Sequence, residues 1–228
     1  MLADLAIESQ IYPIYVEAGL VWEQAEKESL ERFLAALAHP NIEPVTYLSV
    51  PVGPILGAHW SVTGNAVPGA MAPDSEMFIP GRNILLIALA AVWCSTHDVH
   101  RIAIGSLGGN PFPDATPEFF ESFGNVLGAG LGHEITIEAP FRGQNKAELI
   151  SSHRGLPLEL SLTCANPPGG HLSSAAHSSS LPLPERPDAA PTHTLLNDIT
   201  HCGSCNKCTE RQDAFREAVV EDRTKYLV

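Results

Sequence analysis

Three cysteines near the end of the chain carry the clearest chemical signal in the sequence. Cys202, Cys205 and Cys208 are spaced as Cys-x2-Cys-x2-Cys, a spacing that lets three thiolates converge on one metal ion. A tetrahedral zinc site needs a fourth nitrogen or sulfur donor. The sequence offers Cys164, which lies earlier in the chain, or the adjacent His201, and we favour Cys164.

A site of four thiolates would be structural, because it leaves no coordination position open for a substrate. Two alternatives stay open. An iron–sulfur cluster also uses closely spaced cysteines, although the Cys-Pro that ends a bacterial ferredoxin motif does not follow Cys208. Buried thiols without any metal are disfavoured, because closely spaced thiolates repel one another unless a cation holds them. The fifth cysteine, Cys94, lies in an apolar run and is interpreted as a core residue.

Cationic and amide side chains stand where two predicted helices begin. Arg82 and Asn83 open an apolar run, and the free N–H groups and positive dipole of a helix start favour anions, so Arg82 can hold a phosphate or a carboxylate. The plainer alternative is a surface ion pair for Arg82 and a capping role for Asn83. Lys146 also opens a predicted helix and can contact a phosphate, although a solvated lysine is the commoner case.

The loop from Gly105 to Asp114 follows a predicted strand and brings backbone N–H groups and one carboxylate to the end of that strand. It does not match the Gly-x-Gly-x-x-Gly pattern of dinucleotide-binding proteins. Asp114 and Glu118 can act as a base or position a nucleophile, but carboxylates at a helix start are also typical caps.

Short runs rich in β-branched and aromatic residues alternate with stretches of helical spacing along the chain. Strands are predicted at residues 11–16, 45–50, 101–105 and 134–138, and helices at 22–37, 84–94, 117–127, 146–153 and 209–225. This alternation predicts an α/β fold with a doubly wound parallel sheet. Ligands should then bind beyond the carboxyl ends of the strands, at the loops 17–22, 105–114 and 139–146.

The domain organisation follows from a change in composition. Residues 1–160 are predicted to form the α/β domain and residues 161–228 a small metal-binding segment, with an insertion at 165–200 that is rich in proline and serine and is expected to have little fixed structure.

The composition excludes several classes of protein. The chain has 228 residues, 44% of them hydrophobic, and a formal net charge of -13, which is the reverse of what extended nucleic-acid binding requires. The longest apolar run, residues 84–94, is far shorter than the roughly 20 residues that span a bilayer. The first ten residues show no secretion signal, so we expect a cytoplasmic protein whose cysteines are metal ligands or buried thiols.

Taken in order, these pieces resemble the 7-cyano-7-deazaguanine synthases, and more closely a branch of synthase-like paralogues. The resemblance is collinear over most of the chain. It rests on Pro80-Gly81-Arg82-Asn83, on Gly105 with Asn110-Pro-Phe-Pro-Asp114-Ala-Thr-Pro117-Glu118-Phe119, on Pro140 with Lys146-Ala-Glu148, on Leu156-Pro-Leu-Glu-Leu-Ser-Leu-Thr-Cys164, and on Cys202-Gly-Ser-Cys205-Asn-Lys-Cys208 with Arg211 and Ala214-Phe215.

The resemblance implies an adenine-nucleotide-hydrolase-like, Rossmann-like fold, a homodimer and an ATP-dependent ligase. In that family a 7-carboxy-7-deazaguanine is activated as an acyl adenylate, ammonia captures it as an amide, and a second adenylation with loss of water gives the nitrile of the queuosine pathway. The co-substrates would be ATP, with Mg²⁺, and ammonia.

The resemblance also assigns roles to individual residues. Structural zinc falls on the four cysteines, Cys164, Cys202, Cys205 and Cys208. Arg82, Asn83 and Lys146 match positions that line the nucleotide and substrate site, which makes them candidate catalytic residues. Gly105, Asp114 and Glu118 match the loop over the substrate.

The sequence departs from the family pattern in two places. The phosphate-cradling loop Ser-Gly-Gly-x-Asp-Ser is absent, and the first residues look like the middle of the helix that follows this loop. The 228 residues are therefore expected to bind ATP poorly, and we favour a start placed too late over a degenerate paralogue. Residues 14–23 and the insertion also differ. Three alternatives follow: adenylation of another acid, conjugation of a deazaguanine to a protein, and a non-catalytic zinc-stabilised module.

Overall fold

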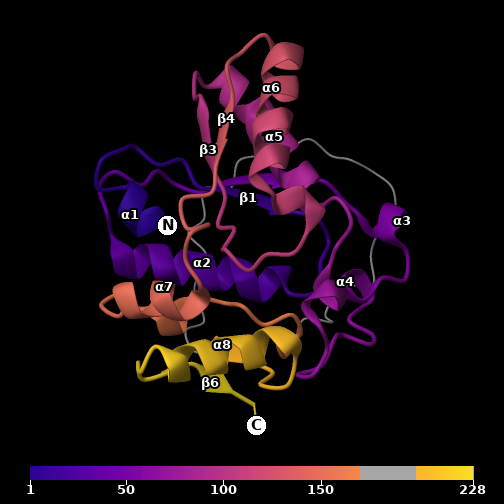
Figure 1. The fold of residues 1–228 in the computed structure, drawn as a ribbon, viewed down its shortest axis with the longest axis vertical. Coiled ribbons are helices and arrows are strands. Elements are labelled where there is room, and N and C mark those ends of the chain that lie inside the picture. Colours follow the sequence, from indigo (N-terminus) through magenta and orange to yellow (C-terminus); the bar gives the residue numbers. More distant parts are fainter. Residues whose placement is uncertain (170–198, 228) are drawn as a thin grey trace, which may run out of the picture.

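The computed structural model describes residues 1–169 and 199–227. Two β-α-β units form its α/β part (Figure 1). The first consists of β1 (Ile14–Glu17), α2 (Glu23–Leu37) and β2 (Thr46–Ser49), and the second of β3 (Arg101–Ala103), α6 (Pro117–Leu131) and β4 (Thr136–Glu138). Both strand pairs are parallel, with Ile14 opposite Thr46 and Arg101 opposite Thr136. The predicted strands and the alternation of elements are thereby confirmed.

Helix α5 (Arg82–Thr96) connects the two units in space, because it packs against both β1 and β3. Its side chains Ile87, Ala90, Ala91 and Cys94 are buried, as the apolar run predicts. Among the described residues the pairs β1–β2 and β3–β4 are not hydrogen-bonded to each other. The structure therefore confirms an α/β fold with parallel strands, while a single doubly wound sheet stays a prediction.

Local sequence explains where the helices begin. Thr116 caps α6, because its side-chain oxygen accepts a hydrogen bond from the Phe119 N–H. Helix α7 (Lys146–Ser152) starts with a capping box, in which the side chain of Asn145 accepts from the Glu148 N–H and that of Glu148 accepts from the Asn145 N–H. Both starts agree with the predicted positions.

The C-terminal part packs on α7. Helix α8 (Asn206–Glu217) buries Ala214 and Phe215 against Ala147 and Ile150, and the two-residue strands β5 (Thr200–His201) and β6 (Lys225–Tyr226) pair in parallel beside it. The predicted helix 209–225 is wrong at its end. The chain leaves the helix after residue 217 and turns at Val219, which has a positive φ of 54° that a helix does not tolerate.

The remaining described elements are short connections between these units. They are α1 (Leu2–Leu5), α3 (Gly53–Leu56), α4 (Trp60–Thr63), η1 (Asp74–Met77), η2 (Pro113–Ala115) and η3 (Leu158–Leu160).

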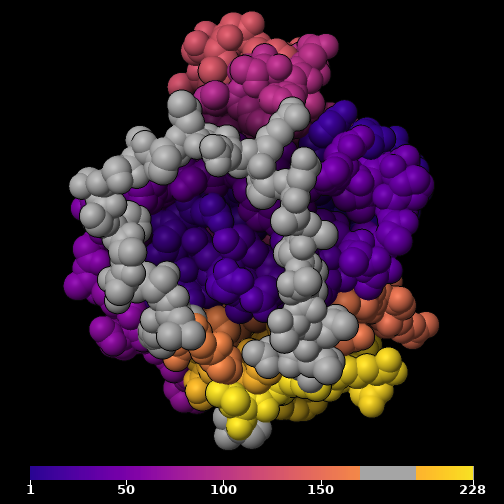
Figure 2. All heavy atoms as spheres, turned by 180° about the vertical axis from the view of Figure 1, so that it is seen from behind, coloured from indigo at the N-terminus to yellow at the C-terminus, as the bar shows by residue number. Residues whose placement is uncertain are grey.

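The two ends of the molecule belong to different parts of the chain. Seen from behind, residues around β3 and α6 form one end and the C-terminal residues the other (Figure 2). Most of the predicted insertion 165–200 lies outside the described residues. In residues 1–169 and 199–227, no helix has the length and apolar character needed to cross a bilayer.

Candidate functional site

The four cysteines converge on one point, as predicted. One sulfur from each of Cys164, Cys202, Cys205 and Cys208 lies within 4.8 Å of the others. The Sγ atoms of Cys202 and Cys208 are 3.9 Å apart. Tetrahedral zinc with Zn–S bonds of about 2.3 Å places its sulfur ligands about 3.8 Å from one another. This four-cysteine cluster therefore has a geometry compatible with a metal site.

The surroundings of the cluster favour thiolates. The backbone N–H groups of Cys202 and Asn166 both donate to Cys164 Sγ at 3.3 Å, which is typical of a sulfur that carries negative charge. The hydrogen bond between Cys164 and Cys205 raises the pKa of the Cys164 thiol and lowers that of Cys205. Without a cation the cluster keeps protons on some of its sulfurs, so a divalent ion supplies the charge that lets all four ionise.

His201, the other candidate for fourth ligand, lies beside the cluster. Its Nδ1 is 3.9 Å from Cys208 Sγ, its side chain is fully buried, and its Nε2 has no hydrogen-bond partner among the described residues. Burial lowers the pKa of His201 to about 4, so the ring is neutral near pH 7. Cys164, and not His201, is the fourth member of the group of close donor atoms.

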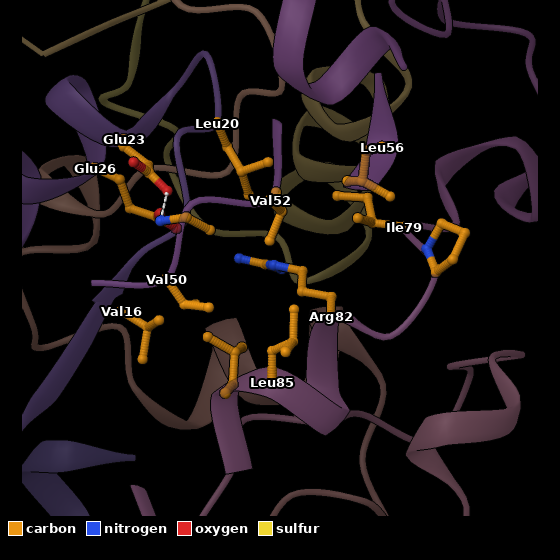
Figure 3. Close-up of a pocket in the computed structure, with 13 residues that line it drawn as sticks. Val16, Leu20, Glu23, Glu26, Val50, Val52, Leu56, Ile79, Arg82 and Leu85 are labelled. Carbon is orange, nitrogen blue, oxygen red and sulfur yellow. Dashed lines mark hydrogen bonds between the residues drawn. The ribbon is translucent and has the colours of Figure 1, made fainter. Parts of the chain in front are cut away.

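A pocket opens beyond the carboxyl ends of β1 and β2, where the loop 17–22 was predicted to form a site (Figure 3). Three ionisable side chains line it: Glu23 and Glu26 from α2, and Arg82 from the first position of α5. The rest of the lining is apolar. It comprises Val16, Ala18, Leu20, Val50, Val52, Leu56, Ile79, Pro80, Leu85 and Leu86.

The side chain of Arg82 extends into this pocket (Figure 3). Its guanidinium forms no ion pair or hydrogen bond with any described residue and lies 6.0 Å from the centre of the Trp22 ring. Gly81, with φ of 73°, turns the chain into α5 directly before it. The predicted position at a helix start is confirmed, and the alternative of a surface ion pair is not observed among these residues. The arginine is available to bind an anion.

Glu23 is a pocket residue that the sequence did not single out. Its carboxylate accepts hydrogen bonds from the N–H groups of Ala18 at 2.6 Å and Gly19 at 3.0 Å, and so fixes the loop after β1. Burial nevertheless raises the pKa of this carboxyl. Neighbouring Glu26 accepts a hydrogen bond from the Tyr15 hydroxyl at 2.8 Å. The only local signal was the pair of glutamates at a predicted helix start.

Asn83 and Asp114 contact each other rather than the pocket. The Asp114 carboxylate accepts the backbone N–H of Asn83 at 3.1 Å, and the Asn83 amide donates to the Asp114 carbonyl oxygen at 3.1 Å. Asp114 is buried and caps α5, a helix that begins 32 residues earlier in the sequence. It therefore positions the helix that carries Arg82.

Replacing Asp114 with alanine should lower the free energy of unfolding by about 1–2 kcal/mol, because α5 loses its side-chain cap. Glu118 is exposed in the first turn of α6 and provides the matched control, since Glu118→Ala should change stability by less than about 0.5 kcal/mol. Urea denaturation followed by circular dichroism measures both. Equal losses in the two variants would contradict the capping role.

Two predicted site loops contact each other at the end of β3. The N–H of Gly108, in the loop that starts at Gly105, donates to the Gln144 carbonyl oxygen at 3.0 Å. A Cβ atom on Gly108 would lie only 2.7 Å from the Arg142 carbonyl oxygen, so this approach requires glycine. Gly105 itself is exposed and is not among the residues that line the pocket.

Lys146 lies at the interface of α7 and α8. Its ammonium pairs with Glu210 at 2.8 Å, and Glu210 also pairs with Lys207 at 2.9 Å. Burial lowers the pKa of Lys146. Burial alone would raise the pKa of Glu210, but the two lysines outweigh it and lower that pKa. Lys146 does not line the Arg82 pocket, so the structure does not bring the three candidate catalytic residues together there.

The chain is similar in sequence to proteins that share one name. The chain is 32% identical over 153 residues to the 7-cyano-7-deazaguanine synthase of Methanocaldococcus jannaschii, covering 66% of this chain and 57% of the relative. It is 25% identical over 199 residues to the synthase of the same name from Coxiella burnetii strain RSA 493, covering 83% and 76%. The chain thus spans little more than half the length of the archaeal relative.

The family comparison covers more of the chain. The model described as "Queuosine biosynthesis protein QueC" matches residues 19–219, a range that includes Arg82 and all four cysteines. Because this match extends over most of the sequence, the chain belongs to the queuosine biosynthesis protein QueC family.

Proposed function

We propose that this chain acts in queuosine biosynthesis as an ATP-dependent carbon–nitrogen ligase that converts 7-carboxy-7-deazaguanine and ammonia into the nitrile. The family match and the names of the relatives support the pathway and the product. The observation that carries the proposal is the Arg82 guanidinium, which has no ion pair or hydrogen bond within residues 1–169 and 199–227, in an otherwise largely apolar pocket at the carboxyl ends of parallel strands.

The pocket suits a flat, anionic substrate. Apolar side chains can cover the faces of a purine-like ring, and the one cation, Arg82, can neutralise a carboxylate or a phosphate. Arginine presents several N–H donors in one plane, which matches the two oxygens of either anion. Asp114 holds the start of α5 and thereby fixes where this cation stands.

The proposed chemistry proceeds through two activations. A carboxylate oxygen attacks the α-phosphorus of ATP and pyrophosphate leaves; ammonia then attacks the acyl carbon and AMP leaves, giving the amide. The amide oxygen is adenylated in turn, and loss of a second AMP and of protons gives the nitrile. Arg82 stabilises the negative charge on the acid and on the adenylate. The co-substrate is ATP, bound with Mg²⁺.

The four-cysteine cluster fits a zinc ion with no open coordination position. When bound, the ion contributes folding free energy rather than chemistry. The cluster ties Cys164 to the start of α8, which in turn packs on α7. A homodimer stays a prediction.

Replacing Arg82 with alanine should weaken the binding of 7-carboxy-7-deazaguanine by about tenfold to a hundredfold, because one charge-assisted hydrogen-bonding pair is worth about 1.5–3 kcal/mol. Calorimetry on the purified chain measures this directly. Arg154→Ala is the matched control, because Arg154 is an exposed arginine that does not line the pocket, and its binding should be unchanged. Equal binding by the wild type and the Arg82 variant would contradict the assignment of this pocket.

Turnover distinguishes the ligase from its alternatives. The protein expressed from the full open reading frame is expected to form AMP and the nitrile, and mass spectrometry detects both products. Binding of the acid without any AMP would favour a non-catalytic module. A deazaguanine mass increment on a co-purified protein, without free nitrile, would favour conjugation to a protein terminus.

A further inference from the structure

A second group of metal-ligating side chains lies far from the cysteines in the fold, in the turns that enter β3 and β4. Asp98 and His100 follow α5 and precede β3, while His133 follows α6 and precedes β4. The three therefore gather beyond the amino ends of two parallel strands, at the end of the molecule that carries β3, β4 and α6 (Figure 1). Neither the Arg82 pocket nor the four-cysteine cluster includes any of them.

The donor atoms of this group are close together. One ligand atom from each residue lies within 4.8 Å of the others, and Asp98 Oδ1 is 3.6 Å from His100 Nε2. The rings of His100 and His133 stack with their centroids 4.3 Å apart and their planes 16° from parallel. Two imidazoles and one carboxylate on two adjacent turns form a compact set of donors.

Hydrogen bonds to the backbone determine which ring nitrogen of each histidine is left free to bind a metal. His100 Nδ1 faces the Glu134 carbonyl oxygen at 3.1 Å, and His133 Nε2 faces the Val99 carbonyl oxygen at 2.8 Å. A carbonyl oxygen can only accept, so each of these nitrogens carries the proton. The lone pairs then reside on His100 Nε2 and His133 Nδ1. Metal-binding histidines are held in this way, by donating the other ring N–H to a carbonyl or carboxylate.

We propose that Asp98, His100 and His133 form a surface site for a divalent transition metal ion such as Ni²⁺, Cu²⁺ or Zn²⁺. Imidazole nitrogen suits these ions, whereas Mg²⁺ and Ca²⁺ prefer sites made only of oxygen. Metal–nitrogen bonds of about 2.0–2.1 Å require the donors to draw closer and the rings to leave their parallel stack. The side chains of His100 and Asp98 are 50% and 96% exposed and can make this adjustment, and solvent completes the coordination.

Ion pairing alone does not account for the group. An exposed pair such as Asp98 with His100 contributes little to stability. It also gives no role to the backbone hydrogen bond that orients His133. A metal ion uses all three side chains and both oriented rings at once.

Nickel chloride titrated into the purified chain by calorimetry, with the metal of the four-cysteine cluster in place and quantified before and after, tests the site. One additional ion per chain should bind, and His133→Gln and Asp98→Asn should each weaken its binding by about tenfold or more. His97→Gln is the matched control, because His97 lies at the same end of the molecule, stacked on Trp93, but outside the group. Its binding should equal that of the wild type.

Two results would overturn the proposal. One is the absence of a second equivalent of nickel while the cysteine-bound metal stays constant. The other is equal weakening in the His97 control and in the two site variants. Asp98→Asn guards against loss of folding as the cause, because its nearly fully exposed side chain can change without disturbing the core.

Discussion

A Cys205→Ser variant is expected to lose the metal of the four-cysteine cluster and to purify largely unfolded in its C-terminal part. Structural zinc sites contribute an apparent binding free energy of about 10–16 kcal/mol, which is comparable to or larger than the net stability of about 5–15 kcal/mol of a whole domain. The cysteines are also the centre of a buried cluster that includes Met77 and Ala165, so losing the ion disrupts the packing around them. Metal analysis and far-ultraviolet circular dichroism measure both effects.

Cys94 provides the control for this experiment. It is 3% exposed on the buried face of α5 and lies outside the four-cysteine cluster. Cys94→Ala should keep one metal ion per chain and lose only about 1 kcal/mol of stability, as is usual for a small core substitution. A Cys205→Ser chain that retained one ion and the wild-type melting temperature would show that the cluster is not a metal site. A brown protein that absorbs visible light would indicate an iron–sulfur cluster instead of zinc.

The second large effect is expected at Arg211, whose guanidinium lies inside the C-terminal part at 3% exposure. It donates to Thr224 Oγ1 at 2.9 Å, to Ser161 Oγ at 3.0 Å and to the Leu158 carbonyl oxygen at 2.7 Å. Arg211→Met would leave these buried acceptors without their donor, at a cost of about 3–5 kcal/mol. Urea denaturation of the metal-loaded chain measures this loss.

A comparison with Arg211→Lys separates charge from hydrogen bonding. An ammonium group keeps the positive charge but cannot reach three acceptors on different elements. It also lacks the planar guanidinium that packs on Phe215, whose ring centre lies 5.0 Å from the Arg211 guanidinium carbon. The lysine variant should therefore fall between the wild type and the methionine variant. If all three unfolded at the same urea concentration, the buried hydrogen bonds would not contribute to stability.

The four-cysteine cluster was predictable because the spacing of three of its cysteines in the sequence is typical of metal binding. Three of the four cysteines lie within seven consecutive residues. A chain with five cysteines then offers only two further thiols as the fourth ligand. The Cys164 sulfur lies with the other three, as predicted, while its role as a metal ligand stays a prediction. His201 lies beside the four-cysteine cluster. Its position next to Cys202 in the sequence does not distinguish a metal ligand from a packed side chain.

The Arg82 pocket was only partly predictable. The helix start at Arg82 follows from the glycine before it and the apolar run after it, which are local features. The capping of α5 by Asp114 depends on a contact across 31 residues, and no local pattern reports it. The absence of an ion pair at Arg82 among the described residues likewise depends on how two units pack, as does the burial of Glu23.

Element types were easier to predict than their ends and their joining. The strand and helix periods located every long helix and the four strands of the α/β part. The end of α8 was missed because the charged residues after Glu217 are compatible with helical spacing, and only the backbone turn at Val219 stops the helix. Whether two strand pairs become one sheet depends on hydrogen bonds between strands, which periodicity does not encode.

The contact of Cys164 with Cys202 has a consequence for engineering. The backbone N–H of Cys202 donates to Cys164 Sγ, so the two ends of the intervening segment are held together by the cluster itself. Lengthening a segment whose ends are already fixed costs only about 0.6 kcal/mol for each doubling of its length. Inserting a fluorescent reporter or an affinity tag between residues 169 and 199 is therefore expected to leave the melting temperature of the metal-loaded chain nearly unchanged.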